Sequence, residues 1–209
     1  MHLNNRVLVW ATFAHVFFFA GGFATNNSSA SNDVNFYYFA YGSNLYDKRI
    51  HVNNPSAVFY SVAVLRDYRL DFNMSSKLWR GAPATICNDP GGSVWGALWV
   101  IQQSDRKHLD NQENIYYPTF VPVTTIDGKK LQALVYIQYY QPKKLPSWKD
   151  LPMERRPSIT YINVMITGAV KVGLPLQYNK MLCTIPHNNQ HADPIILKQL
   201  GKPFSDYIE

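Results

Sequence analysis

The stretch FAYGSNL, residues 39–45, follows a run of aromatic residues with a glycine and two small polar side chains. A strand that stops at Gly42, Ser43 and Asn44 leaves several backbone N–H groups without strand partners. Glycine lets the chain bend so that these groups point to one spot, which favours an anion such as a carboxylate or a phosphate. The alternative is that Ser43 or Asn44 caps a short helix beginning near Leu45. A Walker-type phosphate loop is excluded because no Gly-Lys-Ser/Thr follows.

β-Branched and alternating segments predict a β-rich core that would hold this stretch in place. The first strand is expected directly before the glycine, at Tyr37 to Tyr41. Asp127-Gly128 lies between two later strands and predicts a hairpin turn. The other strands are expected at Val58 to Leu65, Tyr68 to Phe72, Val94 to Ile101, Thr119 to Thr125 and Leu131 to Tyr140.

Short helices are expected around these strands. One runs from a cap at Ser104 or Asp105 to about Glu113. A second follows Ser158, where apolar residues recur at spacings of three and four, and it ends before Gly173. The third is expected at Pro194 to Leu200.

Composition and charge narrow the class of protein. The chain has 209 residues, of which 46% are hydrophobic, and this suits one domain with a proper core. Lys and Arg outnumber Asp and Glu by 20 to 14, which gives a net charge of +6. The basic residues are spread along the chain, whereas nucleic-acid-binding proteins usually concentrate them on one face. We therefore expect no nucleic-acid partner.

The N-terminal segment differs from the rest of the chain. A lone Arg6 precedes an uncharged apolar run from Val7 to Ala20, and small residues at positions 22 and 24 suit signal peptidase. An uncleaved signal anchor, which would make the membrane a partner, is the alternative, because a spanning helix needs only ~20 apolar residues. With cleavage, we expect a secreted or secretory-lumen protein with a signal peptide at 1–24, a flexible Asn/Ser lead-in at 25–35 and one folded domain at 36–209.

Two further features fit that compartment. Asn26, Asn27 and Asn73 begin glycosylation sequons. Cys87 and Cys183 are the two cysteines, so they allow one intrachain disulfide, and two separate buried thiols are the alternative. No Cys/His spacing typical of a metal site occurs, so we expect no bound metal.

Several motifs together resemble the γ-glutamylcyclotransferases in sequence, order and spacing. The resemblance covers Phe36 to about Asn188 and leaves the N-terminal segment and the C-terminal tail outside. FAYGSNL followed by LDNQE at 109–113 is its specific part, because two rare motifs coincide at the right separation. The other motifs are NPSAVF at 54–59, DYRLDF at 67–72, VWGALW at 94–99 and TGAVKVGLPLQY at 167–178.

The resemblance implies a fold and a reaction. Enzymes of this family convert γ-glutamyl amino acids, or γ-glutamyl amines in a sister group, into 5-oxoproline and a free amine. The α-amine of the substrate attacks its own γ-carbonyl, so neither a protein nucleophile nor a cofactor is implied. The site must grip the α-carboxylate, accept a proton from the α-ammonium and stabilise the oxyanion. The implied fold is a single α/β (α+β) domain, a small mixed partly closed β-barrel flanked by short helices.

The resemblance also assigns roles to individual residues. It makes Glu113 the general acid/base, although on its own Glu113 would be interpreted as a surface helix residue. Burial against an apolar pocket can raise the pKa of such a carboxylate enough for it to accept and return a proton. Asp110 is expected to be a structural or capping carboxylate. The glutamyl end of the substrate would be bound by Tyr41, Gly42, Ser43, Asn44 and Leu45.

Tyr116, Tyr136 and Tyr161 are expected to wall the pocket, since their hydroxyls can orient a polar substrate. Core packing is the alternative for each of them. The sequence departs from the family pattern after Glu113, where Asn114 replaces the usual glycine and the link to Tyr116 is short. The polar segment at 141–157 is also longer than the family pattern, and we expect it on the surface, where it can cover or extend the pocket.

The sequence therefore predicts cyclisation of a small γ-glutamyl substrate to 5-oxoproline. The main alternative is a catalytically silent secreted relative that uses the same pocket to bind an acidic ligand or a partner protein. The leaving group and the oligomeric state, monomer or homodimer, are left open by the sequence.

Overall fold

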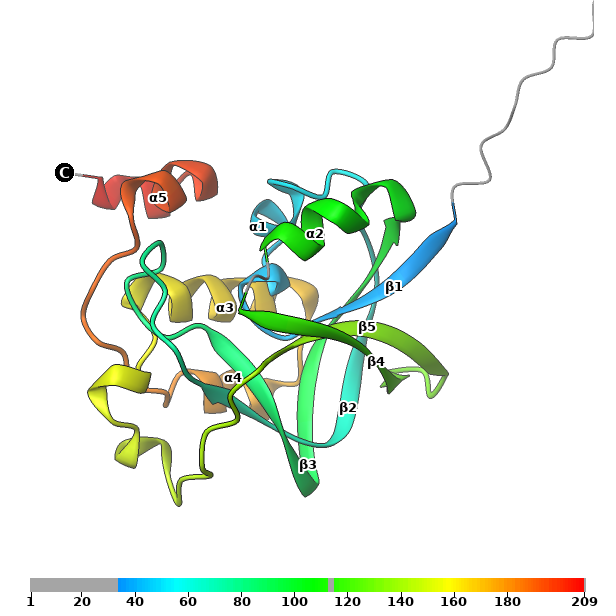
Figure 1. Ribbon diagram of the computed structural model, residues 1–209, viewed down its shortest axis with the longest axis horizontal. Helices are drawn as coiled ribbons and strands as arrows, with labels where there is room; N and C mark the ends of the chain where they lie inside the picture. The colour runs from blue at the N-terminus through cyan, green and yellow to red at the C-terminus, as the bar shows by residue number, and fades with distance from the viewer. Residues whose placement is uncertain (1–33, 113–114, 209) are drawn as a thin grey trace, which may run out of the picture. The chain divides into compact units, whose positions relative to one another are not determined.

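The structure is a computed structural model, which describes residues 34–112 and 115–208. The predicted signal peptide lies outside the described residues, as does most of the predicted lead-in. Five strands form a closed barrel in the order β1-β3-β2-β4-β5 (Figure 1), so the predicted α+β domain with a mixed barrel is confirmed. The strands are β1 Asn35–Ala40, β2 Val58–Phe72, β3 Ala84–Gln102, β4 Tyr116–Thr125 and β5 Lys130–Gln138.

Most of the barrel is antiparallel. β1 pairs with β3 from Asn35↔Gln102 to Ala40↔Ala97, and β2 and β3 form a long hairpin. β4 and β5 form a second hairpin, whose turn has Gly128 at φ +87°, as the Asp127-Gly128 pair predicted. One parallel pair, Tyr38↔Leu134, joins β1 to β5 and closes the barrel, which leaves no free edge strand.

The β2–β3 hairpin is longer than the sequence predicted. The two strands expected on either side of Arg66-Asp67 are one strand, with a register shift between Arg66 and Tyr68 where Asp67 has a φ of +62°. Such an irregularity bends a strand without ending it. β3 begins at Ala84 and not at Val94, because the polar run NDPGG conceals a strand whose first part pairs with the end of β2.

Short helices surround the barrel, with α1 and α2 together near one end of it and α3 alongside it (Figure 1). The α-helices are α1 Asp47–His51, α2 Arg106–Gln112, α3 Ile159–Val172, α4 Leu176–Leu182 and α5 Pro194–Leu200. The 3-10 turns are η1 Ser43–Leu45, η2 Gln103–Asp105, η3 Trp148–Asp150, η4 Met153–Arg155 and η5 Phe204–Tyr207. Within the described part of the chain, no helix is both long and apolar enough to cross a bilayer.

The termini of α3 agree with the sequence prediction. The Ser158 hydroxyl accepts a hydrogen bond from the Tyr161 N–H at 3.1 Å, and Gly173 ends the helix with a φ of +80°. The helical segment begins slightly earlier than predicted, because Ser104 and Asp105 lie inside η2, whose start no side chain caps. The Asp105 carboxylate instead accepts hydrogen bonds from the N–H of Ser56 at 3.0 Å and from its hydroxyl at 2.6 Å.

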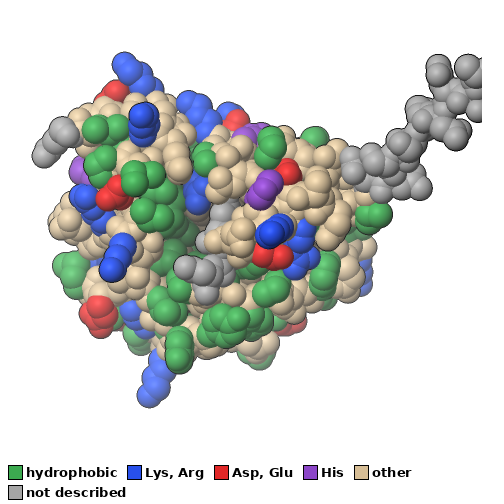
Figure 2. Space-filling model, turned by 45° about the horizontal axis from the view of Figure 1, so that its top comes forward, with side chains coloured by type: hydrophobic (Ala, Val, Ile, Leu, Met, Phe, Trp, Pro, Cys, Tyr) green, Lys and Arg blue, Asp and Glu red, His purple; other side chains and the backbone are tan. Residues whose placement is uncertain are grey.

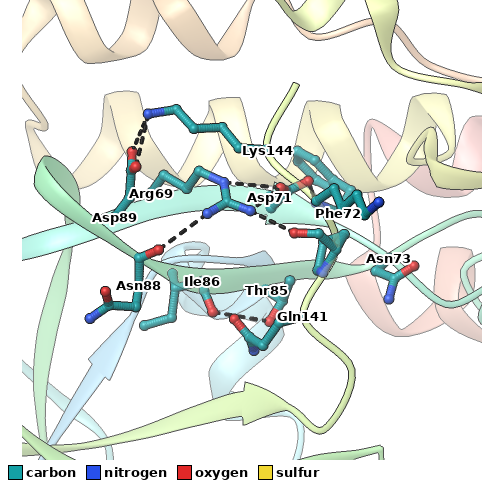
Figure 3. Close-up of polar contacts among 12 residues, drawn as sticks. Arg69, Asp71, Phe72, Asn73, Thr85, Ile86, Asn88, Asp89, Gln141 and Lys144 are labelled. Carbon is teal, nitrogen blue, oxygen red and sulfur yellow. Dashed lines mark hydrogen bonds and ion pairs between the residues drawn. The ribbon is translucent and has the colours of Figure 1, made fainter. Parts of the chain in front are cut away.

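The polar segment at 141–157 lies on the surface but is held down by buried charges (Figure 3). Asp71 on β2 is buried and forms ion pairs with Arg69 at 3.2 Å and with Arg155. Arg69 also donates to the Pro142 carbonyl at 2.7 Å, and Lys144 binds Asp89 of β3 at 2.8 Å. These contacts explain how a long polar segment keeps one conformation, because a buried carboxylate requires charged partners.

The two cysteines do not form the disulfide that the sequence allowed. Cys87 is buried on β3, whereas Cys183 is exposed after α4, and both are free. The alternative of two buried thiols therefore holds for Cys87 alone. Burial raises the pKa of the Cys87 thiol to about 11.

Candidate functional site

A pocket of about 940 Å³ opens beside the end of β1. Figure 2 shows the corresponding hollow in the surface, between α5 and α2. It brings together all the predicted site residues that the structure describes except one, and these are Tyr41, Gly42, Ser43, Asn44, Tyr116, Tyr136 and Tyr161. The exception is Leu45, whose side chain is fully buried and whose N–H donates to the Gly42 carbonyl at 3.0 Å.

The chain turns at the pocket wall directly after β1. Gly42 precedes η1, and among the described residues the N–H groups of Ser43 and Asn44 have no hydrogen-bond acceptor. The helix-cap alternative is wrong, because no side chain caps η1 or α1. The Asn44 side-chain amide donates instead to the Tyr38 hydroxyl at 3.1 Å. This turn therefore leaves two adjacent backbone donors at the pocket wall.

Gly42 is needed because the phenol of Tyr161 lies very close to it. A Cβ atom added at Gly42 would lie 2.9 Å from the Tyr161 hydroxyl oxygen. That distance is shorter than normal van der Waals contact, so any larger residue would displace the phenol or the turn. The glycine of FAYGSNL thus sets the separation between the turn and α3, which carries Tyr161.

Ala84, at the start of β3, positions two of the predicted tyrosines. Its N–H donates to the Tyr161 hydroxyl at 3.0 Å, and its carbonyl accepts from the Tyr116 hydroxyl at 2.7 Å. Ala84 itself lines the pocket. One backbone unit of β3 therefore brings the phenols from α3 and β4 to the same part of the wall.

The third tyrosine, Tyr136 on β5, hydrogen-bonds a carboxylate. Its hydroxyl donates to Oδ1 of Asp110, and the same oxygen accepts from Nε of Arg106 at 2.9 Å. Burial and the bond to Asp110 raise the pKa of Tyr136, so its phenol stays neutral. The hydroxyl of Tyr41 donates to the Tyr136 carbonyl at 2.6 Å and ties β1 to β5. Asp110 has the structural role that the sequence predicted for it.

An arginine and a tryptophan complete this side of the pocket. The Arg49 guanidinium lies 5.7 Å from the centre of the Trp79 ring, within the range of a cation–π interaction. The Trp79 ring also packs edge-on against Tyr161, with the ring centres 4.8 Å apart. Of the described residues that line the pocket, Arg49, Lys77 and His108 are basic and none is Asp or Glu.

Comparison with known proteins places the chain in a family. Residues 93–182 match the model of the AIG2-like family. The γ-glutamylcyclotransferase of Bos taurus is 39% identical over 175 residues, which cover 80% of this chain and 87% of that protein. The Homo sapiens γ-glutamylcyclotransferase is 38% identical over 76% of this chain and 82% of its own. A solved γ-glutamyl cyclotransferase structure superposes with a TM-score of 0.70 at 34% identity, over 83% of this chain and 97% of its own.

The chain belongs to the γ-glutamylcyclotransferase family. Its predicted general acid/base, Glu113, lies outside the described residues, as does Asn114. Two described residues close to it in the sequence, Asn111 and Ile115, both belong to the pocket wall. Tyr116 also reaches the pocket although its link to the LDNQE motif is short for this family.

One side of the pocket was not predicted from the sequence. Residues 75–79 and α5 line it, whereas no residue of the 141–157 segment does, so the prediction that this segment covers or extends the pocket is wrong. Trp79 in the run SSKLW was a signal, because a tryptophan side chain is highly buried on average in folded proteins. α5 lay beyond the part of the chain that resembles the family, so no motif pointed to it. The described residues hold no cluster of three or more metal-ligating side chains.

Proposed function

We propose that this protein is a γ-glutamylcyclotransferase. The α-amine of a γ-glutamyl amide attacks the γ-carbonyl carbon, a new C–N bond closes the 5-oxoproline ring, and the C–N bond to the leaving amine breaks. The attacking nitrogen loses two protons on its way from α-ammonium to lactam N–H, and the leaving nitrogen gains two on its way from amide N–H to ammonium. The reaction therefore consumes no water and needs no redox partner. The enzyme has only to fold the substrate, carry protons from the attacking nitrogen to the leaving nitrogen and stabilise the oxyanion.

One observation carries the proposal. The FAYGSNL turn and the tyrosines Tyr116, Tyr136 and Tyr161 come from four separate elements, yet they face one pocket. The family resemblance assigns these same residues to the glutamyl site. Family membership and the basic, carboxylate-free character of the described wall both support an acidic substrate.

The described contacts suggest how the glutamyl group would be held. The adjacent N–H groups of Ser43 and Asn44 suit the α-carboxylate, because paired backbone donors favour an anion. The Tyr136 hydroxyl donates its hydrogen bond to Asp110, so its oxygen offers lone pairs and suits the α-ammonium. Glu113 would take the proton from that ammonium and return it to the leaving amine, in line with the pocket-lining residues on either side of it.

The test is turnover by the Glu113→Gln variant. Wild-type protein is incubated with γ-glutamyl-alanine, γ-glutamyl-ε-lysine and glutathione, and 5-oxoproline is measured. Losing the general acid/base should lower kcat by roughly 10²–10⁴-fold. Glu154→Gln is the matched control, because Glu154 is exposed on η4 and does not line the pocket.

Each outcome decides between the candidates. Turnover of an amino-acid conjugate would indicate an enzyme for γ-glutamyl amino acids. Turnover of the ε-lysine conjugate would indicate an enzyme for γ-glutamyl amines. Binding without turnover would support the silent relative, and full activity of Glu113→Gln would remove the acid/base assignment. Circular dichroism of both variants excludes unfolding as the cause of a loss.

We also infer that the chain enters the secretory route. Support comes from the apolar run at 7–20 and the small residues before Thr25, together with the sequons at Asn26, Asn27 and Asn73. The Asn73 side-chain amide donates to the Tyr140 carbonyl at 3.3 Å, and a glycan attached to its nitrogen would leave one N–H for this bond. Asn26 and Asn27 lie outside the described residues.

A further inference from the structure

The pocket is larger than a glutamyl group requires. Its volume of about 940 Å³ is near the upper end for sites that take a drug-sized ligand, and a glutamyl group is smaller than that. The turn and the tyrosines account for one part of the wall. The rest must face the group that leaves when the ring closes, or solvent.

A series of contacts connects the residues that line the pocket. Gly42 lies against Tyr161, Tyr161 packs on Trp79, and Leu78 is the next residue along the chain. The Leu78 carbonyl accepts from the N–H of Asp193 at 2.8 Å, which fixes the 75–79 loop to the start of α5. The loop and α5 therefore form one continuous part of the wall, which joins the glutamyl turn through Trp79 and Tyr161 and is called the distal side below.

This distal side carries apolar side chains that are open to solvent. Leu78 is 49% exposed and Ile195 is 61% exposed, and both line the pocket. Ile196 and Gln199 line it as well, and the spacing of Ile195 to Gln199 places both on one face of α5. Figure 2 shows hydrophobic side chains gathered along the side of the hollow toward α5. A ligand with an apolar group would remove this surface from water.

A positively charged side chain lies next to this apolar surface. Lys77 lines the pocket and directly precedes Leu78. An α-amino acid carries a carboxylate and a side chain on one carbon, so it matches a cation and an apolar side chain on adjacent residues. A simple amine would satisfy the apolar surface alone.

We infer that Leu78 and Ile195 form a subsite for the side chain of the leaving amino acid, and that Lys77 attracts its carboxylate. The inference rests on the proposed cyclotransferase activity and adds its substrate class: γ-glutamyl dipeptides whose second residue is large and apolar. Glycine in that position leaves the subsite empty, and an amine leaves Lys77 without a partner. The 75–79 loop and α5 thus set the leaving-group preference together.

Three substrates test the inference on the full chain: γ-glutamyl-leucine, γ-glutamyl-glycine and γ-glutamyl-isopentylamine, which is the leucine conjugate without its carboxylate. We expect kcat/KM for the leucine conjugate to exceed that for the glycine conjugate by at least about tenfold. Removal of the carboxylate should lower kcat/KM by about fivefold, as for a partly exposed ion pair.

Substitutions assign these preferences to residues. Leu78→Ser and Ile195→Ser should each lower the leucine-to-glycine ratio of kcat/KM by at least about threefold. Leu176→Ser and Val170→Ser are matched controls, because these side chains are 67% and 61% exposed and lie outside the pocket. Lys77→Gln should lower the leucine-to-isopentylamine ratio, and Lys180→Gln should not. Each ratio compares two substrates on one sample, so it does not depend on the fraction of folded protein.

The outcomes separate the subsite from the activity. Equal kcat/KM for the leucine and glycine conjugates, or an unchanged ratio in both apolar variants, would overturn the subsite and leave the cyclotransferase standing. No 5-oxoproline from any of the three substrates would overturn the proposed activity and the subsite with it.

Discussion

At the scale of single residues, Asp105 shows how a buried carboxylate supports the site indirectly. Its hydrogen bonds to Ser56 join the NPSAVF motif to the start of α2, the helix that carries Asp110. Burial alone would raise the pKa of Asp105, but the bonds from Ser56 and the nearby His108 outweigh it and lower the pKa. The charged form is therefore the stable one in the folded protein.

This lowered pKa predicts a pH-dependent loss of stability. At pH 7, Asp105→Asn should reduce the free energy of unfolding by about 1–3 kcal/mol, because charge-assisted bonds to Ser56 are lost. The stability from a carboxyl with a lowered folded pKa is present above its unfolded pKa of about 3.9 and is lost as pH falls through the folded value. The difference from wild type should therefore shrink below about pH 4.

Urea unfolding at pH 7 and at pH 3 measures this effect. Asp150→Asn is the control, because Asp150 is exposed on η3. An equal loss at both pH values would show that Asp105 acts by packing and not by its charge.

At the scale of elements, α3 meets the FAYGSNL turn without a side chain between them. A Cβ at Gly168 would lie 2.4 Å from the Tyr46 backbone nitrogen and 2.5 Å from the Leu45 carbonyl carbon. Both atoms are backbone, so neither can rotate away. The helix that carries Tyr161 therefore fixes the position of the turn directly.

Gly168→Ala tests this contact. Alanine normally favours a helix over glycine by about 1 kcal/mol, yet here we expect a loss of about 1–3 kcal/mol in stability, because the turn or the helix must move. KM for the γ-glutamyl substrate should rise as well, since the Ser43 and Asn44 donors move with the turn. Thr167→Ala, exposed on the same helix, is the control for both thermal unfolding and kinetics. A more stable Gly168→Ala protein would contradict this prediction.

The elements also show what the sequence could and could not predict. α3 was predictable because its apolar spacing, its Ser158 cap and its Gly173 end all agree. The start of β3 was not, because the polar run NDPGG inside it, opposite the register shift at Asp67, hides strand pairing that depends on partners in β2. Asp105 looked like a cap, since its bond to Ser56 is formed only in the folded chain.

The residues of the site also fall into those that the sequence could predict and those that it could not. Motif spacing predicted the turn and its tyrosines, which lie close to family motifs. It did not predict that Leu45 would face inward, because the side chain of a turn residue points wherever the packing of α3 directs it. Nor could it place Leu78 and Ile195 together, since only a tertiary contact joins their segments.

At the scale of the whole molecule, the proposed secretory route can be tested on the complete chain. Expressed in animal cells, the protein should appear in the medium with its N-terminus near Thr25, as N-terminal sequencing would show. Val9→Asp places a charge in the apolar run and should keep the protein inside the cell. Recovery of membrane-bound protein that still begins at Met1 would favour the signal anchor.

The position of α5 in the pocket wall has a consequence for the order of events during synthesis. A ribosome produces β1 and its turn first, the last barrel strand ends at Gln138, and α5 follows much later. Domains begin to fold while synthesis continues, so a growing chain has every strand of its barrel before it has a complete pocket. The helix that joins late is the one that faces the leaving group. A nascent chain can therefore contain the residues that bind the glutamyl group before it contains the helix of the proposed leaving-group subsite.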